Sequence, residues 1–215
     1  MDISPDIIPQ GSIQWHEQRL GKVTASRVAD VIAKTKTGWG ASRANYMAEL
    51  LVERLTGNPT EGFTNAAMQW GKDQEPAARE TYEFINACVV EPAPFVDHPT
   101  IPMAGASPDG FVGADGLVEC KCPNSATHSD TLLGDPIPAK YVAQMQWQMA
   151  CAGRKWCDWV SFDPRFPASM RLFIQRVERD DKMIGELEKA VTEFLLELDG
   201  KVTALRSKYE TKAAA

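Results

Sequence analysis

The strongest constraint on the fold is a change in the spacing of apolar residues along the 215-residue chain. Long segments with helical spacing enclose a middle region of short apolar runs that proline and glycine interrupt, which is typical of strands joined by tight turns. This order predicts a mixed α/β architecture with one central sheet flanked by helices. With no repeat or linker we expect a single domain: N-terminal helices over about 12–86, the sheet over about 88–177 and a final helix over about 180–206.

Local signals place several helix ends. Ser42 and Gly57 bracket a strongly amphipathic segment as N-cap and C-terminal stop. Helical spacing over 11–34 favours a helix there, with Thr24 or Ser26 as N-cap. Pro76 predicts a new helical start inside the helix expected over 65–87. A further helix over 139–153 interrupts the strands, and Asp180 or Asp181 caps the last helix.

The composition is that of an ordinary globular domain, with 44% hydrophobic and 24% charged residues. The sequence contains no apolar run near the roughly 20 residues needed to cross a bilayer, which predicts no membrane association. Residues 1–10 lack a basic segment followed by an apolar core, so we expect no secretory signal and a cytoplasmic location. Five scattered cysteines are then expected to be free thiols.

The formal net charge of −6 argues mildly against a nucleic-acid partner, but the charge is unevenly distributed. Residues 19–43 hold six basic side chains and one acidic side chain. Such a strip is consistent either with a phosphate-binding face or with a solvated helix surface.

A candidate reactive centre occupies residues 106–122, ASPDGFVGADGLVECKC. Glu119 and Lys121 are two residues apart on one expected strand and therefore share a face, which Asp109 joins if its strand pairs with theirs. Two adjacent carboxylates are costly unless a cation neutralises them, and hard oxygen ligands suit Mg²⁺. The alternative is an exposed hairpin with a Pro-Asp-Gly turn and a Glu–Lys surface pair.

Five blocks in a fixed order resemble the family of phage lambda exonuclease and YqaJ-type viral recombinases, within the PD-(D/E)xK nuclease superfamily. The blocks are WHEQRLGKVTAS, WGKDQEPAAR, SPDG, GLVECKCP and AQMQWQM, and the later FDPR and VERDDK also resemble that family. The resemblance implies a restriction-endonuclease-like core and a Mg²⁺-dependent 5′→3′ exonuclease. Such an enzyme degrades one strand of linear double-stranded DNA and leaves a 3′ single-stranded tail for recombination. It also implies two Mg²⁺ per active site with Mn²⁺ as a substitute, a ring-shaped homotrimer, and a single-strand annealing recombinase as partner.

The same resemblance assigns roles to residues of this sequence. The side chains of Asp109, Glu119 and Glu75, with the backbone carbonyl of Cys120, would bind metal. Asp109 and Glu119 would thereby serve catalysis together with Lys121, which a general argument also favours, because a lysine beside a metal can orient water and stabilise developing charge.

On the expected helix over 139–153, Gln144 matches the family's active-site glutamine, which would position water or phosphate. Gln148 lies one turn further along and shares that face. For both residues the alternative is an ordinary polar helix face.

A pocket for the 5′-phosphate would be formed by Arg19, Ser26 and Ser107, and Trp15 matches an aromatic residue near the separated strands. An arginine can hold phosphate through two hydrogen bonds, and hydroxyls can donate to it. The simpler interpretations are a surface arginine, helix caps and a core tryptophan.

One departure from the family concerns the loop after the Glu119 strand, where the family contributes an arginine. Residues 123–134 contain neither Arg nor Lys; Thr127 falls near the expected position beside His128, and Lys140 is the candidate replacement on sequence distance. The preference for a 5′-phosphate is therefore an open question.

Three other hypotheses stay open. A restriction-like endonuclease or a non-catalytic DNA-end-binding module could use the same core. A structural zinc or iron–sulfur site would need clustered cysteines, and Cys120, Cys122, Cys151 and Cys157 lack that spacing. Cys120 is expected to face the core, opposite to Glu119. No P-loop motif is present, so no motor is evident, and continuous digestion would have to come from topology or from the substrate.

Overall fold

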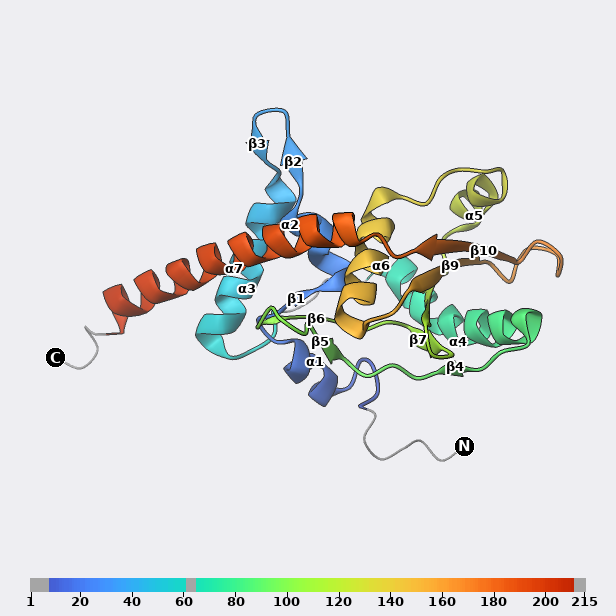
Figure 1. The fold of residues 1–215 in the computed structure, drawn as a ribbon, viewed down its shortest axis with the longest axis horizontal. Coiled ribbons are helices and arrows are strands. Elements are labelled where there is room, and N and C mark those ends of the chain that lie inside the picture. Colours follow the sequence, from blue (N-terminus) through green and yellow to red (C-terminus); the bar gives the residue numbers. More distant parts are fainter. Residues whose placement is uncertain (1–7, 61–64, 211–215) are drawn as a thin grey trace.

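The computed structural model describes residues 8–60 and 65–210 (Figure 1). The prediction that no secretory signal is present concerns residues 1–10, of which 1–7 lie outside the described residues. Within the described part, no helix is both long and apolar enough to cross a membrane.

A five-stranded mixed sheet forms the centre of the fold. Its strand order is β10-β9-β8-β7-β4. The β8–β9 pair is parallel and the other neighbours are antiparallel. The sheet confirms the predicted mixed α/β class. Its strands are β4 (Val90–Glu91), β7 (Gly110–Val112), β8 (Gly116–Lys121), β9 (Trp156–Phe162) and β10 (Leu172–Glu178).

One helix packs on each face of this sheet. Successive residues of β8 point to opposite faces, so alternate residues contact different helices. On one side, Val118 and Cys120 pack with Tyr82 of α4 (Ala66–Asn86), which confirms that Cys120 faces the core. On the other side, Leu117 packs with Met145 of α6 (Ala139–Ala152). Glu119 and Lys121 follow Leu117 in the two-residue repeat, so they lie on the α6 side.

The expectation of a single sheet was wrong. β5 (Val96–Asp97) and β6 (Ala104–Ala106) leave the central sheet and form a three-stranded sheet with β1 (Val23–Thr24). Four prolines between 92 and 102 remove ladder donors around β5, which favours short strands and turns. The parallel β1–β6 pairing brings residues that follow the first helix beside the chain that leads to Asp109.

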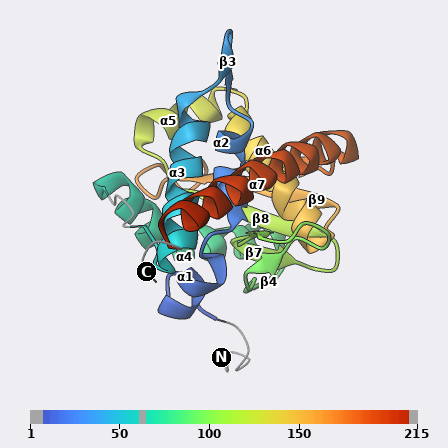
Figure 2. The same cartoon turned by 90° about the vertical axis from the view of Figure 1, so that its left-hand side faces the viewer.

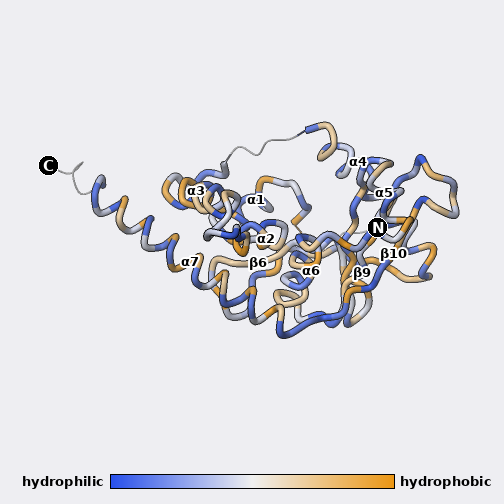
Figure 3. Tube along the Cα trace, turned by 90° about the horizontal axis from the view of Figure 1, so that it is seen from above, coloured by the Kyte–Doolittle hydropathy of each residue, from blue (hydrophilic) through white to orange (hydrophobic). Residues whose placement is uncertain are grey.

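The N-terminal segments and the last helix build the other half of the molecule. α1 (Ile13–Arg19), η1 (Ala25–Arg27), α2 (Val28–Val31), α3 (Ala41–Thr56) and α7 (Asp181–Tyr209) are its helices. Buried residues of α2, α3 and α7 share one apolar cluster with part of α6. Figure 3 shows hydrophobic and hydrophilic residues alternating along α7, as expected for a helix with one packed face.

A hairpin of β2 (Lys34–Thr35) and β3 (Gly38–Trp39) was not anticipated from the sequence. It projects from the body in both views of Figures 1 and 2. The two strands are two residues long each, and a period-2 pattern cannot be recognised over so few residues. Its side chains at Lys34, Lys36 and Trp39 are exposed.

Several helix boundaries differ from the prediction. The segment 11–34 is not one helix, since the chain turns at Gly21 with φ 67° before β1. Thr24 precedes η1 without a side-chain capping bond, and the N-cap of α3 is Gly40 rather than Ser42. Pro76 lies inside α4 on an exposed face, where solvent can bond the carbonyl that proline leaves unpaired.

Other boundaries are confirmed. Gly57 ends α3 in the left-handed conformation with φ 70°, and Gly153 ends α6 in the same way. Asp180 caps α7 by accepting from the backbone N–H groups of Lys182 and Met183. Glycine and aspartate at helix ends are therefore reliable local signals here.

Candidate active site

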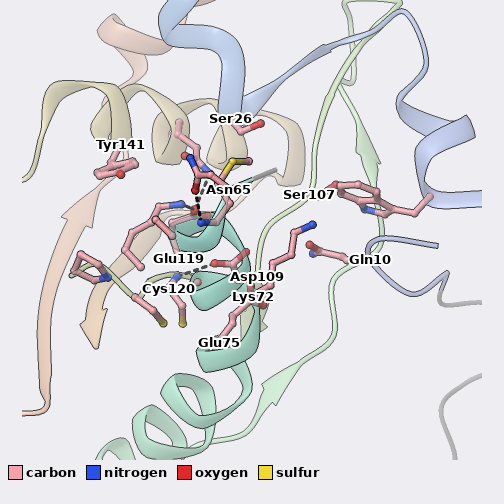
Figure 4. A pocket seen from close by; sticks show the side chains of 18 of the residues that line it. Gln10, Ser26, Asn65, Lys72, Glu75, Ser107, Asp109, Glu119, Cys120 and Tyr141 are labelled. Carbon is pink, nitrogen blue, oxygen red and sulfur yellow. Dashed lines mark hydrogen bonds and ion pairs between the residues drawn. The ribbon is translucent and has the colours of Figure 1, made fainter. Parts of the chain in front are cut away.

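All ten residues predicted for the site line one cavity of about 580 Å³ (Figure 4). The cavity lies against β8 and is bounded by residues of α1, α4 and α6 and by the segment that leads into β7. The ten residues are Trp15, Arg19, Ser26, Glu75, Ser107, Asp109, Glu119, Cys120, Lys121 and Gln144.

Asp109 is placed beside Glu119 by the register of β7 on β8. Gly110 pairs with Val118, so the residue before β7 lies opposite Glu119. Oδ2 of Asp109 accepts a hydrogen bond of 2.7 Å from the backbone N–H of Cys120. This bond fixes the carboxylate against the strand that carries the other catalytic candidates.

Gly110 serves close packing rather than a turn. A Cβ at this position would lie 2.1 Å from Cγ1 of Val90 on the neighbouring strand β4. The turn between β7 and β8 comes later, at Gly113 with φ 55°. The Pro-Asp-Gly sequence is thus part of the sheet, which excludes the exposed-turn alternative for Asp109.

Glu119 lies at the inner end of the cavity with only 1% of its surface exposed. Its Oε1 accepts from Nζ of Lys121 and, at 2.6 Å, from Nε2 of Gln144. Its Oε2 accepts from Nε2 of Gln148, also at 2.6 Å. A buried carboxylate held by three donors, one of them cationic, satisfies the requirement that buried charges be paired.

The two glutamines lie four residues apart on α6 and therefore share a helix face. Gln146 between them points the other way, where it bonds the carbonyl of Glu178 and the N–H of Asp180. The sequence placed Gln148 on the same helix face as Gln144 but left open whether that face is only an ordinary polar surface. The structure places Gln148 in direct contact with Glu119.

Negative charge accumulates at this end of the cavity. Burial and the carboxylates of Glu119 and Glu75 raise the pKa of Asp109 well above its usual range. Burial acts to lower the pKa of Lys121, but Glu119 and Asp109 outweigh it, so the pKa is raised. Burial, with Glu75 and Asp109, also raises the pKa of Cys122 to about 12. The local field therefore favours cations.

The donor set fits a hard divalent cation, which prefers carboxylate and carbonyl oxygens. Asp109, Glu119 and Glu75 line the same cavity, as does Cys120. In the described residues, however, no three acidic, histidine or cysteine side chains form a ready metal-ligand cluster. Glu119 is held by its three donors, and Oε1 of Glu75 accepts from Nη2 of Arg79 at 2.9 Å.

The opposite end of the cavity is cationic. Oγ of Ser107 accepts from Nη1 of Arg19 at 2.9 Å and from Nε1 of Trp15 at 3.1 Å. The guanidinium of Arg19 lies 4.1 Å from the centre of the Trp15 ring. Trp15 is therefore a wall of the site rather than a core residue. Ser26 faces the cavity with an exposed side chain.

Arg19 is held in place by the turn that follows it. The buried carboxylate of Glu53 accepts from the N–H of Gly21 at 2.8 Å, and Nε of Arg54 donates to the Gly21 carbonyl at 2.9 Å. Burial lowers the pKa of Arg19 from its usual value, while Tyr46 and Glu53 oppose that shift. An arginine stays protonated under such shifts, so the cavity keeps this positive charge.

The loop after β8 does not supply a cation. Its residues form α5 (Ser125–Leu132), in which Thr127 bonds the N-cap Asn124 and lies outside the cavity wall. His128 is buried between Ser161 and the carbonyl of Met170. Lys140 stacks on Tyr141, with 4.8 Å from its Nζ to the ring centre, and does not line the cavity.

Half of the basic strip over 19–43 is neutralised within the protein. Lys22 pairs with Asp97, Arg27 with Asp30 and Glu49, and Arg43 with Glu197. Compensated ion pairs of this kind weaken the strip as a continuous phosphate-binding face. Tertiary pairing with distant acids could not be read from the local charge count.

The five cysteines are free, as predicted. Among the cavity residues that were not predicted from the sequence are Gln10, Lys72 and Tyr141. Nε2 of Gln10 donates to the carbonyl of Pro108 at 2.9 Å, which ties the segment before α1 to the Asp109 chain. Lys72 belongs to the block WGKDQE and lies one helical turn before Glu75, which was the available signal.

A mixed sheet flanked by helices, with two acids and a lysine on adjacent central strands, defines the restriction-endonuclease-like class of proteins. Residues 14–155 match the family model of the YqaJ-like viral recombinase domain, and the chain belongs to this family. No curated protein sequence matches it.

Solved structures resemble the whole fold. The alkaline exonuclease LHK-Exo from Laribacter hongkongensis is 50% identical, with a TM-score of 0.86 over 93% of this chain and 99% of that chain. The structure of LHK-Exo in complex with dAMP is 51% identical over the same shares, also with a TM-score of 0.86. A phage related exonuclease from Haemophilus somnus 129PT is 16% identical, with a TM-score of 0.71 over 86% of this chain and 96% of that chain, and supports the fold alone.

Proposed function

We propose that this chain is a Mg²⁺-dependent deoxyribonuclease that degrades one strand of linear double-stranded DNA in the 5′→3′ direction and leaves a 3′ single-stranded tail. One observation carries the proposal. A single cavity joins a carboxylate–lysine cluster to a cationic pocket, so a terminal phosphate and the bond to be cut can be held together. The 50% identical relative, an alkaline exonuclease, supports the same assignment.

The acidic end is proposed to hold two divalent cations through Asp109, Glu119, Glu75 and the carbonyl of Cys120. When bound, they neutralise phosphoryl oxygens and lower the pKa of the attacking water. Glu75 must then exchange its bond to Arg79 for this role. Glu119 is held within the wall by Gln148 and Gln144, which restrict its rotation and pre-organise the carboxylate.

Lys121 is proposed to act as a cation throughout. Because the carboxylates raise its pKa, the ammonium retains its proton. From that position it orients water by hydrogen bonding and stabilises negative charge that develops on the phosphate. The side-chain amide of Gln144 has two polar atoms: its Nε2 donates to Glu119, and its Oε1, which bonds no protein donor within the described residues, can accept from a water molecule.

The cationic end is proposed to hold the 5′-phosphate through Arg19, Ser107 and Ser26. Ser107 now accepts from Arg19 and Trp15, so its own hydroxyl hydrogen remains to be donated. The complex of LHK-Exo with dAMP, a nucleotide with one phosphate, supports a mononucleotide-sized site in this family. Trp15 offers an aromatic edge beside the strand end.

The proposal includes a ring-shaped homotrimer near three times 23.7 kDa that encloses DNA, and a single-strand annealing recombinase as partner. The viral recombinase family to which the chain belongs supports this setting. Sedimentation at working concentration tests the trimer; a monomer that still digests long tracts without interruption contradicts enclosure.

The decisive experiment follows digestion of a linear duplex labelled separately at its two 5′ ends, in Mg²⁺, in Mn²⁺ and in EDTA. In Mg²⁺ we expect early release of each 5′ label as mononucleotide, while the 3′-terminal part of each strand remains as a single-stranded tail. We expect no reaction in EDTA. A covalently closed plasmid should remain intact. Cleavage of the plasmid would indicate an endonuclease, and binding without hydrolysis would indicate an end-binding module.

A further inference from the structure

Lys72 is a cavity residue without a role in the function proposed above. It lies on α4 one turn before Glu75, and it lines the cavity together with Ser107 and Asp109. Two adjoining hollows of the surface are also lined by this lysine. Figure 4 shows Lys72 and Glu75 on α4 beside Asp109. The side chain therefore lies where the acidic and cationic ends of the cavity meet.

The ammonium of Lys72 is not committed to a protein partner. In the described part of the chain it forms no ion pair, although carboxylates lie nearby on its own helix. Glu75 instead bonds Arg79, and Asp73 accepts from Gln69 at 2.8 Å. An exposed lysine without a carboxylate partner is unremarkable by itself, so its position beside a second such cation is what matters.

Arg19 is that second cation. Its guanidinium bonds the neutral hydroxyl of Ser107 and stacks on Trp15, and within the described residues it has no ion pair. By contrast, the basic residues Lys22 and Arg27, which are close to Arg19 in the chain, both have carboxylate partners. Arg19 and Lys72 line the same cavity from different helices, and an anion bound between them would interact favourably with both cations.

The start of α4 adds to this potential. Asn65, Ala67 and Met68, which belong to the N-terminal turn of α4, line the same cavity. The N-terminus of a 21-residue helix carries a partial positive charge and attracts phosphate groups. Arg19, Lys72 and this helix end together favour a phosphomonoester of charge about −2 over a singly charged internal phosphodiester.

We infer that Lys72 is a specificity-determining residue: it is the second cation of the pocket and makes the enzyme select DNA ends that carry a 5′-phosphate. The inference rests on the proposed function of the same site. The segment after β8, from which the resemblance led us to expect a cation, forms α5 and contributes no α5 residue to the cavity. Lys72 of α4 would supply that positive charge instead. A terminal phosphate would lie between Arg19 and Lys72, with Ser107 donating to it.

The test compares binding of two identical duplexes, one with 5′-phosphate and one with 5′-hydroxyl ends, by fluorescence anisotropy in EDTA, where no strand is cut. Wild type should bind phosphorylated ends more tightly. Lys72→Ala should reduce that preference by about tenfold to a hundredfold, the effect of one charged hydrogen bond. Lys72→Arg should keep most of the preference, and Lys140→Ala, altered outside the cavity wall, should keep all of it.

The outcomes separate two failures. Wild-type protein that binds no DNA ends and releases no nucleotides in Mg²⁺ would refute the proposed function itself. Wild type that prefers phosphorylated ends, with Lys72→Ala keeping the full preference, would refute only the role of Lys72. Loss of the preference in Lys140→Ala but not in Lys72→Ala would move the role to Lys140 and likewise overturn the inference.

Discussion

The two ends of the cavity differ in how the protein treats its own charges. At the acidic end, Glu119 is 1% exposed and each of its oxygens accepts from side-chain donors. At the cationic end, the contacts of Arg19 with described residues are to the hydroxyl of Ser107 and the aromatic ring of Trp15. The acidic end is closely packed, and the carboxylate of Glu119 is fully hydrogen-bonded, but negative charge is in excess there. The cationic end is more open and carries an excess of positive charge.

This difference indicates what each end lacks. At the acidic end, burial together with the carboxylates of Glu119 and Glu75 raises the pKa of Asp109. Added cations offset that shift. At the other end a phosphate supplies the missing anion. A change at the acidic end should therefore lower the rate of hydrolysis, and a change at the cationic end should weaken recognition of the DNA end.

The largest expected effect comes from Glu119→Gln, which keeps the size of the side chain but removes its charge. Loss of metal-assisted stabilisation worth several kcal/mol should lower the hydrolysis rate at least about a thousandfold. Affinity for a 5′-phosphorylated end, measured in Ca²⁺, should stay within about threefold of wild type if the two ends are separate. A hydrolysis rate equal to wild type in the purified variant contradicts the role of Glu119.

Arg19→Ala should have the converse effect. We expect the preference for phosphorylated over hydroxyl ends to fall about tenfold to a hundredfold, because one charged hydrogen bond contributes roughly 1.5–3 kcal/mol. Digestion already under way should be affected less, as measured by nucleotide release after a synchronised start. Equal cutting of both kinds of end by wild type and variant would show that Arg19 does not hold the phosphate.

Gln148→Met tests whether the tight packing around Glu119 serves catalysis. The change conserves volume but removes the donor to Oε2 of Glu119, and we expect about a tenfold lower rate. Gln146→Met is the matched control, since Gln146 is equally buried on the other face of α6. It should lower the melting temperature and leave the rate per folded molecule unchanged. Equal rate losses in both variants would reduce Gln148 to a structural residue.

The smallest effect is expected outside the cavity, on the β2–β3 hairpin. Charge reversal at Lys34 and Lys36 should shorten digestion runs a few-fold and leave removal of the first nucleotide nearly intact. If both lysines contact phosphates, the slope of log affinity against log salt should fall by roughly two. An unchanged slope would place the hairpin away from the DNA.

Sequence alone identified the elements whose signals are local. The helices ending at Gly57 and Gly153 were predicted correctly, because a left-handed C-terminal residue is a property of a few neighbours. The spacing of two between Glu119 and Lys121 predicted a shared strand face. The order of helices and short apolar runs gave the α/β class.

Other features depend on residues that are far apart in the chain. Arg19 and Ser107 meet because β1 pairs with β6, and Lys72 lines the same cavity because α4 packs on the central sheet. The division of the strands into two sheets and the helix that continues through Pro76 likewise follow from packing. Local periodicity encodes which face of an element is apolar, whereas the choice of partner for that face is made by burial and pairing across the whole fold.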